Sequence, residues 1–142
     1  MFKILILLVL GTSGLLSKEG CIYGDCINGL GTYVFPSGTK YVGEYKNGLM
    51  NGQGTSTHNN GDKYIGEWKN DLKHGHGVYT FSSGQKYVGD FKNDLKHGHG
   101  TYTSPSGQKY VGGYRNDLQH GHGTYTYSSG DKYVGKYDSN DM

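Results

Sequence analysis

The residues of this chain best suited to chemistry are histidines, which come in pairs separated by one residue. The pairs are His74 and His76, His97 and His99, and His120 and His122. Two such histidines on one strand share a face about 6.5 Å apart, a spacing that some zinc sites use. Equivalent pairs in successive copies would lie about 10 Å apart, too far to share one ion. The pattern therefore favours a solvated or pH-sensitive face over a metal site.

The chain offers no set of residues typical of an active site. No Ser-His-Asp arrangement singles out one serine, and the sequence has neither a lone nucleophilic cysteine nor a phosphate-binding loop. Every candidate histidine or aspartate recurs at a fixed interval, whereas an active site is normally unique. We therefore expect a protein that is not an enzyme and needs no cofactor.

Cys21 and Cys26 are the only cysteines. In an exported chain an even number of cysteines favours a disulfide. Their places in the repeat described below put them on the two arms of the first hairpin, diagonal across its turn on one face. We predict that they form a disulfide which caps the least regular copy; free thiols or a metal pair are the alternatives.

A line of lysines offers a second kind of chemistry, the binding of anions. Each member precedes the first tyrosine of a copy: Lys63, Lys86, Lys109 and Lys132. Spaced about 10 Å apart, these lysines suit an anionic phospholipid or phosphoinositide surface. Acidic residues such as Asp62 are interleaved, however, and exposed mixed charge is usually only solvation. The net charge of +2 is too small, and the lysines too evenly spread, for a nucleic-acid partner.

Residues 1–17 differ from the rest of the chain. Lys3 supplies a positive charge, Ile4–Leu10 is an uninterrupted apolar run, and small residues follow it. This layout is typical of a secretory signal peptide. The alternative is a membrane anchor, but the apolar stretch ends at Leu16, well short of the roughly 20 residues that cross a bilayer. We therefore expect export to the periplasm, the cell surface or the medium.

The remainder of the chain matches itself when it is shifted by 23 residues, the signature of tandem repeats. We divide it into a degenerate N-terminal capping copy at 18–37, complete copies at 38–60, 61–83, 84–106 and 107–129, and a partial copy at 130–142. With 26 glycines and 14 tyrosines but only 2 prolines, the composition favours short strands joined by tight turns.

Within a copy the period is two, as in a strand. Tyr64, Gly66 and Trp68 alternate along one face, and Gly75 and Gly77 continue the alternation further on. We expect the aromatic rings to stack from copy to copy and the glycines to let large rings lie across neighbouring backbone. The positions that should carry the fold are Tyr41, Gly43, Tyr45, Gly52, Gly54, Tyr64, Gly66, Trp68, Gly75, Gly77, Tyr79, Tyr87, Gly89, Phe91, Gly98, Gly100, Tyr102, Tyr110, Gly112, Tyr114, Gly121, Gly123, Tyr125, Tyr133, Gly135 and Tyr137.

Turn signals separate the alternating runs. Asn47-Gly48 is the strongest short hairpin signal, because both central residues of a type I′ turn need a positive φ. Asn70-Asp71 and its two later equivalents are weaker forms of the same signal. The sequence thus predicts an all-β fold: an elongated, single-layer antiparallel sheet of tandem 23-residue hairpins.

The pattern Tyr-x-Gly-x-(Trp/Phe/Tyr)-x-Asn-(Gly/Asp)-x-x-x-Gly-x-Gly-x-Tyr resembles the MORN repeat, the membrane occupation and recognition nexus motif. Tyr64–Tyr79, Tyr87–Tyr102 and Tyr110–Tyr125 match it closely. This sequence departs from the motif where Asp replaces the usual Gly at positions 71, 94 and 117, and where Ser56 replaces a strand tyrosine. The resemblance implies an extended, twisted sheet that serves protein–protein interaction, oligomerisation or, in some members, attachment to membranes.

We therefore expect an exported, non-enzymatic scaffold that binds an unidentified protein or oligomerises. An unpaired strand edge templates pairing with another chain, which predicts a homodimer through the C-terminal edge. A module that binds anionic phospholipid is the first alternative. The second is a carbohydrate-binding cell-surface repeat, but such hairpin arrays are rich in tryptophan and this chain has only Trp68.

Overall fold

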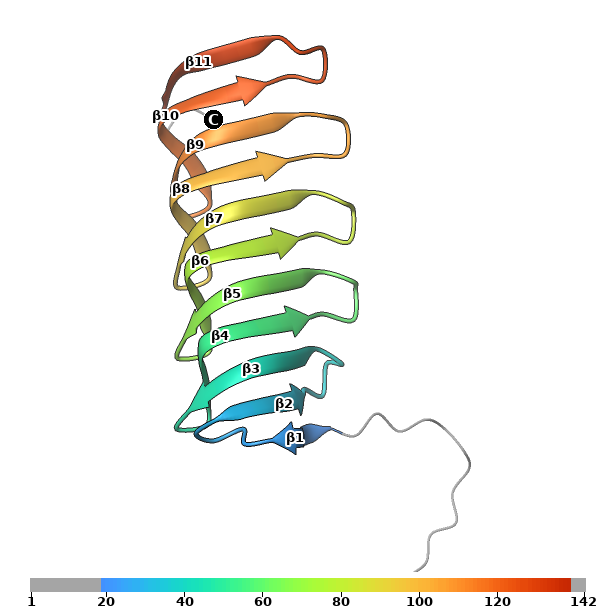
Figure 1. The fold of residues 1–142 in the computed structure, drawn as a ribbon. Coiled ribbons are helices and arrows are strands. Elements are labelled where there is room, and N and C mark those ends of the chain that lie inside the picture. The colour runs from blue at the N-terminus through green and yellow to red at the C-terminus, as the bar shows by residue number, and fades with distance from the viewer. Residues whose placement is uncertain (1–18, 139–142) are drawn as a thin grey trace, which may run out of the picture.

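The computed structural model describes residues 19–138. These residues form eleven strands and no helix: β1 (Gly20–Gly24), β2 (Leu30–Val34), β3 (Lys40–Lys46), β4 (Leu49–Thr57), β5 (Lys63–Lys69), β6 (Leu72–Thr80), β7 (Lys86–Lys92), β8 (Leu95–Thr103), β9 (Lys109–Arg115), β10 (Leu118–Thr126) and β11 (Lys132–Tyr137). Each strand pairs antiparallel with the strands before and after it in the chain, which gives one elongated, twisted sheet (Figure 1). The predicted fold class is confirmed. The predicted signal peptide, 1–17, lies outside the described residues.

The tight turns follow from the Asn-Gly and Asn-Asp pairs. Asn47 and Gly48 have φ angles of 52° and 75°, and Asn70 and Asp71 have 49° and 67°. Positive φ at both central positions is the type I′ geometry, whose twist matches that of the flanking strands. Asparagine and aspartate tolerate this region better than other side-chain-bearing residues. The chain therefore reverses after seven-residue strands such as β3 and β5.

Each regular hairpin carries a bulge that the sequence did not predict. Gly66 faces Gly77 and Trp68 faces Lys73, so Glu67 alone stands opposite three residues of β6. Gly75 sits in this bulge with a φ of 56°. The expected alternation from Gly75 to Gly77 is wrong for that reason: a left-handed residue interrupts the two-residue period. Gly52, Gly98 and Gly121 have positive φ at the equivalent positions.

The core is a single layer of rings on one face of the sheet, which we call the inner face; the opposite face is the outer face. Tyr41, Tyr64, Tyr87 and Tyr110 are fully buried there. Their rings make edge-to-face contacts within a hairpin and across to the next. Tyr64, for example, lies 5.2 Å from Trp68 and 5.1 Å from Phe91 of the following hairpin, between ring centroids. Each such contact contributes about 1 kcal/mol beyond the burial of the rings.

Paired glycines make room for these rings, as the sequence predicts. Gly66 and Gly77 stand directly opposite one another on β5 and β6. A Cβ atom on Gly77 would lie 2.4 Å from the Tyr64 hydroxyl. That hydroxyl donates a hydrogen bond to the Glu67 carbonyl oxygen at 2.9 Å. The tyrosine ring thus lies flat across backbone that only glycine leaves open.

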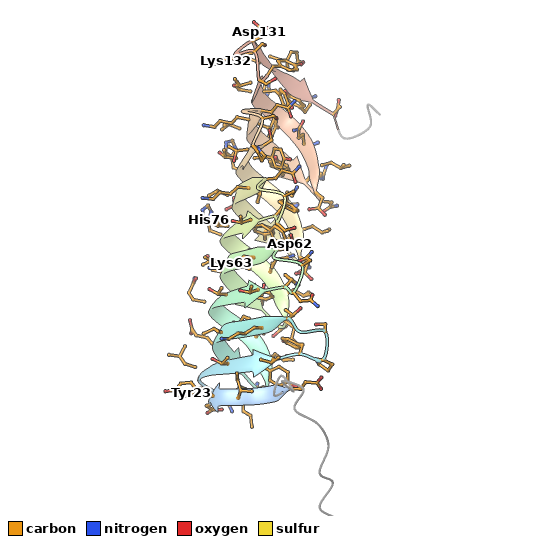
Figure 2. The ribbon with its side chains drawn as sticks, turned by 90° about the vertical axis from the view of Figure 1, so that its right-hand side faces the viewer. Tyr23, Asp62, Lys63, His76, Asp131 and Lys132 are labelled. Atoms are coloured by element: carbon orange, nitrogen blue, oxygen red, sulfur yellow. A yellow bond between two sulfur atoms is a disulfide. The ribbon has the colours of Figure 1, made fainter. Side chains whose placement is uncertain are left out.

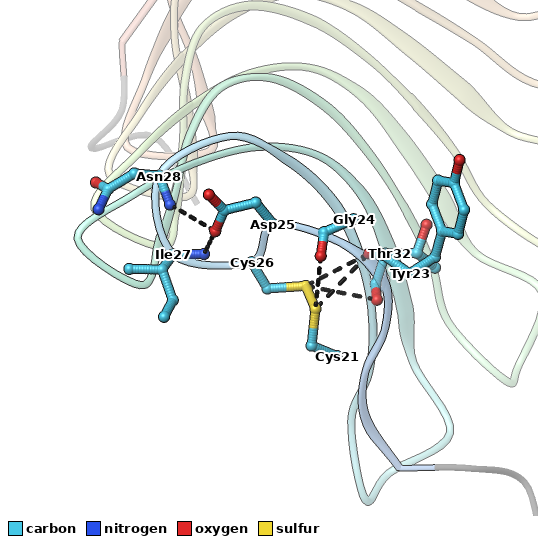
Figure 3. The surroundings of a disulfide bond; sticks show 8 residues. All are labelled: Cys21, Tyr23, Gly24, Asp25, Cys26, Ile27, Asn28 and Thr32. Carbon is cyan, nitrogen blue, oxygen red and sulfur yellow. Dashed lines mark hydrogen bonds between the residues drawn. A yellow bond between two sulfur atoms is a disulfide. The ribbon is translucent and has the colours of Figure 1, made fainter.

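The first hairpin closes the N-terminal end of the sheet in its own way. β1 pairs with β2 in a register that places Gly24 opposite Gly31, and the pairing is irregular between Cys21 and Tyr23. Cys21 and Cys26 form the predicted disulfide (Figure 3). Cys26, however, lies in the connection between β1 and β2 rather than on the second arm, which corrects the expected diagonal arrangement.

The connection after Cys26 docks onto the next hairpin. The carbonyl of Gly29 accepts the Tyr45 N–H at 2.8 Å, and that of Ile27 accepts the Gly48 N–H at 2.9 Å. Asp25 organises the connection by accepting two backbone N–H groups, which lower the pKa of its carboxyl. Together with the disulfide, these bonds cover the open end of the ring layer.

Candidate functional site

The inner face is hollowed into a groove that runs along several hairpins. Its three adjoining parts have volumes of about 320, 410 and 390 Å³. They form one groove because Met50 and Asp71 line the first two parts, and Lys73 and Asp94 line the last two. We call this surface the inner groove.

Two kinds of residue border the inner groove. Aromatic residues from the ends of even-numbered strands and the segments after them form one border, and aspartates of the type I′ turns form the other. The aromatic residues include Tyr33, Phe35, Tyr79 and Phe81, and the aspartates are Asp71, Asp94 and Asp117. A concave, mostly aromatic surface with a few placed charges is typical of a binding site.

Lysines stand between the borders, each among three aromatic rings. The Nζ of Lys73 lies 5.0 Å from the centroid of Tyr79 and 6.0 Å from those of Tyr64 and Phe91. Lys96 lies 5.5 to 5.8 Å from three equivalent rings. Burial lowers the pKa of Lys96, while the charge of Asp117 acts in the opposite direction. These lysines are partly desolvated cations held by ring faces.

The aspartates that replace glycine in the turns join one hairpin to the preceding one. Asp71 accepts the Met50 N–H at 2.8 Å through Oδ1, and its own N–H donates to the Met50 carbonyl at 3.0 Å. Asp94 and Asp117 repeat this arrangement on Lys73 and Lys96. Sequence reasoning took these aspartates only as weaker turn residues. Their recurrence in place of glycine was the available signal for an additional role.

The predicted anion-binding lysines lie on the outer face, away from the inner groove. They are exposed and form one row with the threonines opposite them: Lys63, Lys86, Lys109 and Lys132. Within residues 19–138 none of the four takes part in an ion pair. Figure 2 shows Lys63 projecting from the same side of the ribbon as His76.

The paired histidines do not come together as a regular strand would place them. His76 contacts the carboxylate of Asp90 on the outer face, Nδ1 to Oδ1 at 3.2 Å. The Nδ1 atoms of His74, His97 and His120 are instead buried without a hydrogen-bond partner. The bulge glycine between the two members of each pair separates their environments. Residues 19–138 contain no group of three or more His, Cys, Asp or Glu side chains placed to hold a metal ion.

The described residues contain no helix of the length and apolarity needed to cross a membrane. No curated protein matches the chain. The pattern of the MORN repeat matches five consecutive segments, 19–40, 41–63, 64–86, 87–109 and 110–132. From 41 onward these segments begin at the strand tyrosine, three residues after the start of the copies delimited above. Because the matched segments span more than half of the chain and each coincides with a hairpin of the ring layer, this protein belongs to the MORN repeat family.

Proposed function

We propose that this protein is a non-enzymatic scaffold that binds a segment of another protein in the inner groove. MORN repeats are in general modules for interaction with proteins or membranes. The observation that carries the proposal is the groove itself, in which half-buried rings and partly desolvated lysines stay open to solvent across successive hairpins. Such rings serve as anchor positions at protein interfaces.

The shape of the inner groove favours an extended or helical protein segment over a small molecule. Its three parts adjoin along the sheet rather than forming one enclosed cavity. Charged groups recur along it, with Lys73 and Lys96 between the borders and aspartates in the turns at 71, 94 and 117. A segment that repeats apolar and charged residues would match this surface over several hairpins.

Site-specific photo-crosslinking in the host cell tests this proposal. A photoreactive phenylalanine analogue placed at Phe81, in the inner groove, is expected to give covalent adducts with a protein partner. The same analogue at Ile65, which is 47% exposed and lies on the outer face between Thr55 and Val78, is the matched control. Adducts at Ile65 but not at Phe81, or adducts at neither, would refute binding in the inner groove.

We further propose that the scaffold acts outside the cytoplasm. The support is the Cys21–Cys26 disulfide, since disulfides persist in oxidising compartments. Thiol trapping in intact host cells, followed by fractionation, tests it: the two cysteines should resist alkylation until a reductant is added. Alkylation of both without reductant, in the cytoplasmic fraction, would contradict export.

A second candidate function is attachment to an anionic membrane through the outer face. The observation in its favour is the exposed lysine row from Lys63 to Lys132, whose members form no ion pair within residues 19–138. Flotation with phosphatidylserine or phosphoinositide vesicles tests it. Replacing the row by glutamine should abolish flotation. Replacing Lys69, Lys92 and Arg115, the exposed cations at the last positions of β5, β7 and β9, by glutamine is the control. Absence of flotation at low salt would exclude this function.

A further inference from the structure

The aromatic border of the inner groove loses both of its rings at one hairpin. Two rings pack side by side at the ends of β2 and β6, Tyr33 with Phe35 at 4.8 Å and Tyr79 with Phe81 at 4.6 Å. At the end of β8, Tyr102 keeps the first ring and Ser104 stands in place of the second. At the end of β4 the same two positions hold Ser56 and His58. A pair of rings is therefore missing from the border between two places where it is present.

The interruption opens the largest part of the inner groove. This pocket of about 410 Å³ is lined by Phe35, Met50, Ser56 and Trp68, among others. Ser56 is 3% exposed, and its hydroxyl has no hydrogen-bond partner. A buried polar group without a partner costs free energy, so an occupant that brings a hydrogen-bond donor or acceptor would remove this cost.

The same pocket also lacks a cation that the next two hairpins have. Lys73 lies 3.8 Å from Asp94, and Lys96 occupies the equivalent place beside Asp117. The residue that stands in the equivalent place beside Asp71 is Met50, which carries no charge. Lys73 and Asp94 also line the pocket but pair with each other. The pocket is therefore left with the carboxylate of Asp71, for which its single lining lysine supplies no countercharge.

The field of Asp71 reaches the rings beside the pocket. Burial raises the pKa of Tyr45 to about 12, and the charge of Asp71 adds to this increase. The same charge adds to the increase in the pKa of Tyr41, after the larger effects of burial, Tyr45 and Glu44. The negative charge of Asp71, which opposes the ionisation of these two phenols, would also attract a cation into the pocket.

We propose that this pocket takes a lysine or arginine side chain presented by a partner protein, its cation beside Asp71 and Trp68 and its aliphatic stem along Phe35 and Met50. The arrangement copies the one that the chain builds for itself around Lys73, with a carboxylate at 3.8 Å and rings at 5.0 to 6.0 Å. Tryptophan is the ring that binds cations best. Met50, an adaptable side chain, leaves the stem room to pack. The inference rests on the proposed protein-binding function and names the residue type that the groove selects.

The only tryptophan of the chain lines the pocket, so its fluorescence reports occupation directly. The probe is a blocked alternating alanine–arginine hexapeptide, and its alanine–norleucine counterpart matches its length without the charge. The arginine peptide should shift the Trp68 emission in a saturable way, with an affinity about tenfold higher than that of the norleucine peptide. Equal shifts with both peptides, no shift with either, or a stronger shift with an alanine–tyrosine peptide would overturn the proposal.

Three variants separate the pocket from general charge effects. Asp71→Asn removes the charge while keeping the acceptor for the Met50 N–H, and it should weaken the arginine peptide about tenfold. Asp117→Asn is the same change in a turn outside the pocket and should leave binding unchanged. Met50→Lys supplies the missing cation from within and should abolish binding. Binding that survives both Asp71→Asn and Met50→Lys would refute the assignment.

Ser56→Tyr restores the first of the two missing rings and should also abolish binding of the arginine peptide. Circular dichroism and thermal unfolding show whether each variant keeps its fold, and the restored ring should raise thermal stability. The photo-crosslinking at Phe81 does not depend on this pocket. Adducts at Phe81 without an arginine-specific signal at Trp68 would therefore refute this inference alone. An arginine-specific signal without adducts at Phe81 would refute the proposed binding of a host protein in the inner groove.

Discussion

Asp94 and Lys73 are joined by three contacts across the boundary between two hairpins. The Lys73 N–H donates to Asp94 Oδ1 at 2.9 Å, and the Asp94 N–H donates to the Lys73 carbonyl at 3.0 Å. The Lys73 ammonium lies 3.8 Å from the same carboxylate. A turn aspartate thus fixes the edge of the preceding hairpin and also the cation of the inner groove.

This relationship predicts that the turn aspartates stabilise the array. Asp94→Ala removes the acceptor and leaves a side chain poorly suited to a φ of 71°. It should lower the free energy of unfolding by about 2 kcal/mol, from the lost hydrogen bond and the left-handed conformation together. Asp94→Asn keeps both features and should cost much less. Urea denaturation measures the difference; equal losses for the two variants would show that the hydrogen bond contributes nothing.

The contact of Tyr64 with the glycine pair predicts a coupled cost. Gly77→Ala places a methyl group 2.4 Å from the Tyr64 hydroxyl of a fully buried ring and should destabilise the protein by about 3 kcal/mol. In a Tyr64→Leu background the same change should cost less than about 1 kcal/mol, because the shorter side chain leaves the space open. A double-mutant cycle in urea gives the coupling. A cost that is independent of residue 64 would contradict the packing described.

Much of this architecture follows from the sequence because it depends on neighbours within a few residues. The alternation of Tyr64, Gly66 and Trp68 places rings on one face, and Asn70-Asp71 sets the turn. The resemblance to the MORN repeat further implies that the hairpins form one extended sheet. These features are local, and repetition makes each of them visible several times.

The features that the sequence did not predict depend on two strands or two copies at once. The bulge at Gly75 arises from how β6 pairs with β5, which no single strand pattern records. The pocket at Ser56 exists because Phe35 and Trp68 come from other strands, and its charge because Met50 stands where later hairpins have lysine. A comparison of the positions where one copy differs from the others, such as Ser56 and Met50, would have located this pocket.

The buried phenols predict a loss of stability in alkali. Burial raises the pKa of Tyr79 to about 12, and a hydrogen bond to Asp62 adds to the increase; Tyr45 shifts to about 12 as well. Because the folded pKa exceeds the unfolded value of 10.0, this contribution is fully present below pH 10 and is lost as pH rises toward 12.

Lys96 acts in the opposite direction, since its lowered pKa favours the folded state as pH rises, but it is one group against several tyrosines. Tyrosinate absorbance and circular dichroism should therefore change together between about pH 10 and 12. Tyr79→Phe removes one of these phenols and should reduce the dependence. Phenols that ionise near pH 10 while the sheet stays intact would contradict their burial.

The disulfide predicts a local rather than a global effect. Its ends are five residues apart in sequence, and closing so short a loop contributes about 2 kcal/mol through the unfolded chain. Because contacts in a repeat array are between neighbours, the Cys21→Ser, Cys26→Ser double variant should lose hydrogen-exchange protection in β1 and β2. Amides of β7 to β9 are the internal control, and an equal loss of protection there would mean that the end cap governs the whole array.

The last prediction concerns β11, which pairs only with β10 among the described strands and leaves its other edge open. We propose that two copies associate through this edge. At the opposite end the irregular pairing of β1 disfavours such contact, since bulged edges pair poorly. Antiparallel pairing of β11 with its copy about Val134, outer face beside outer face, places Lys132 of one copy next to Lys136 of the other.

Like charges opposite one another destabilise a strand pair, so association should be weak at low salt and strengthen as salt screens them. Lys136→Glu replaces the repulsion by attraction and should tighten the dimer about tenfold, whereas Lys63→Glu, in the middle of the outer face, should not. Sedimentation or light scattering over a concentration series measures both. A monomer at every salt concentration, for the parent chain and Lys136→Glu alike, would exclude pairing through β11, and a dimer that weakens with salt would place its contact on another surface.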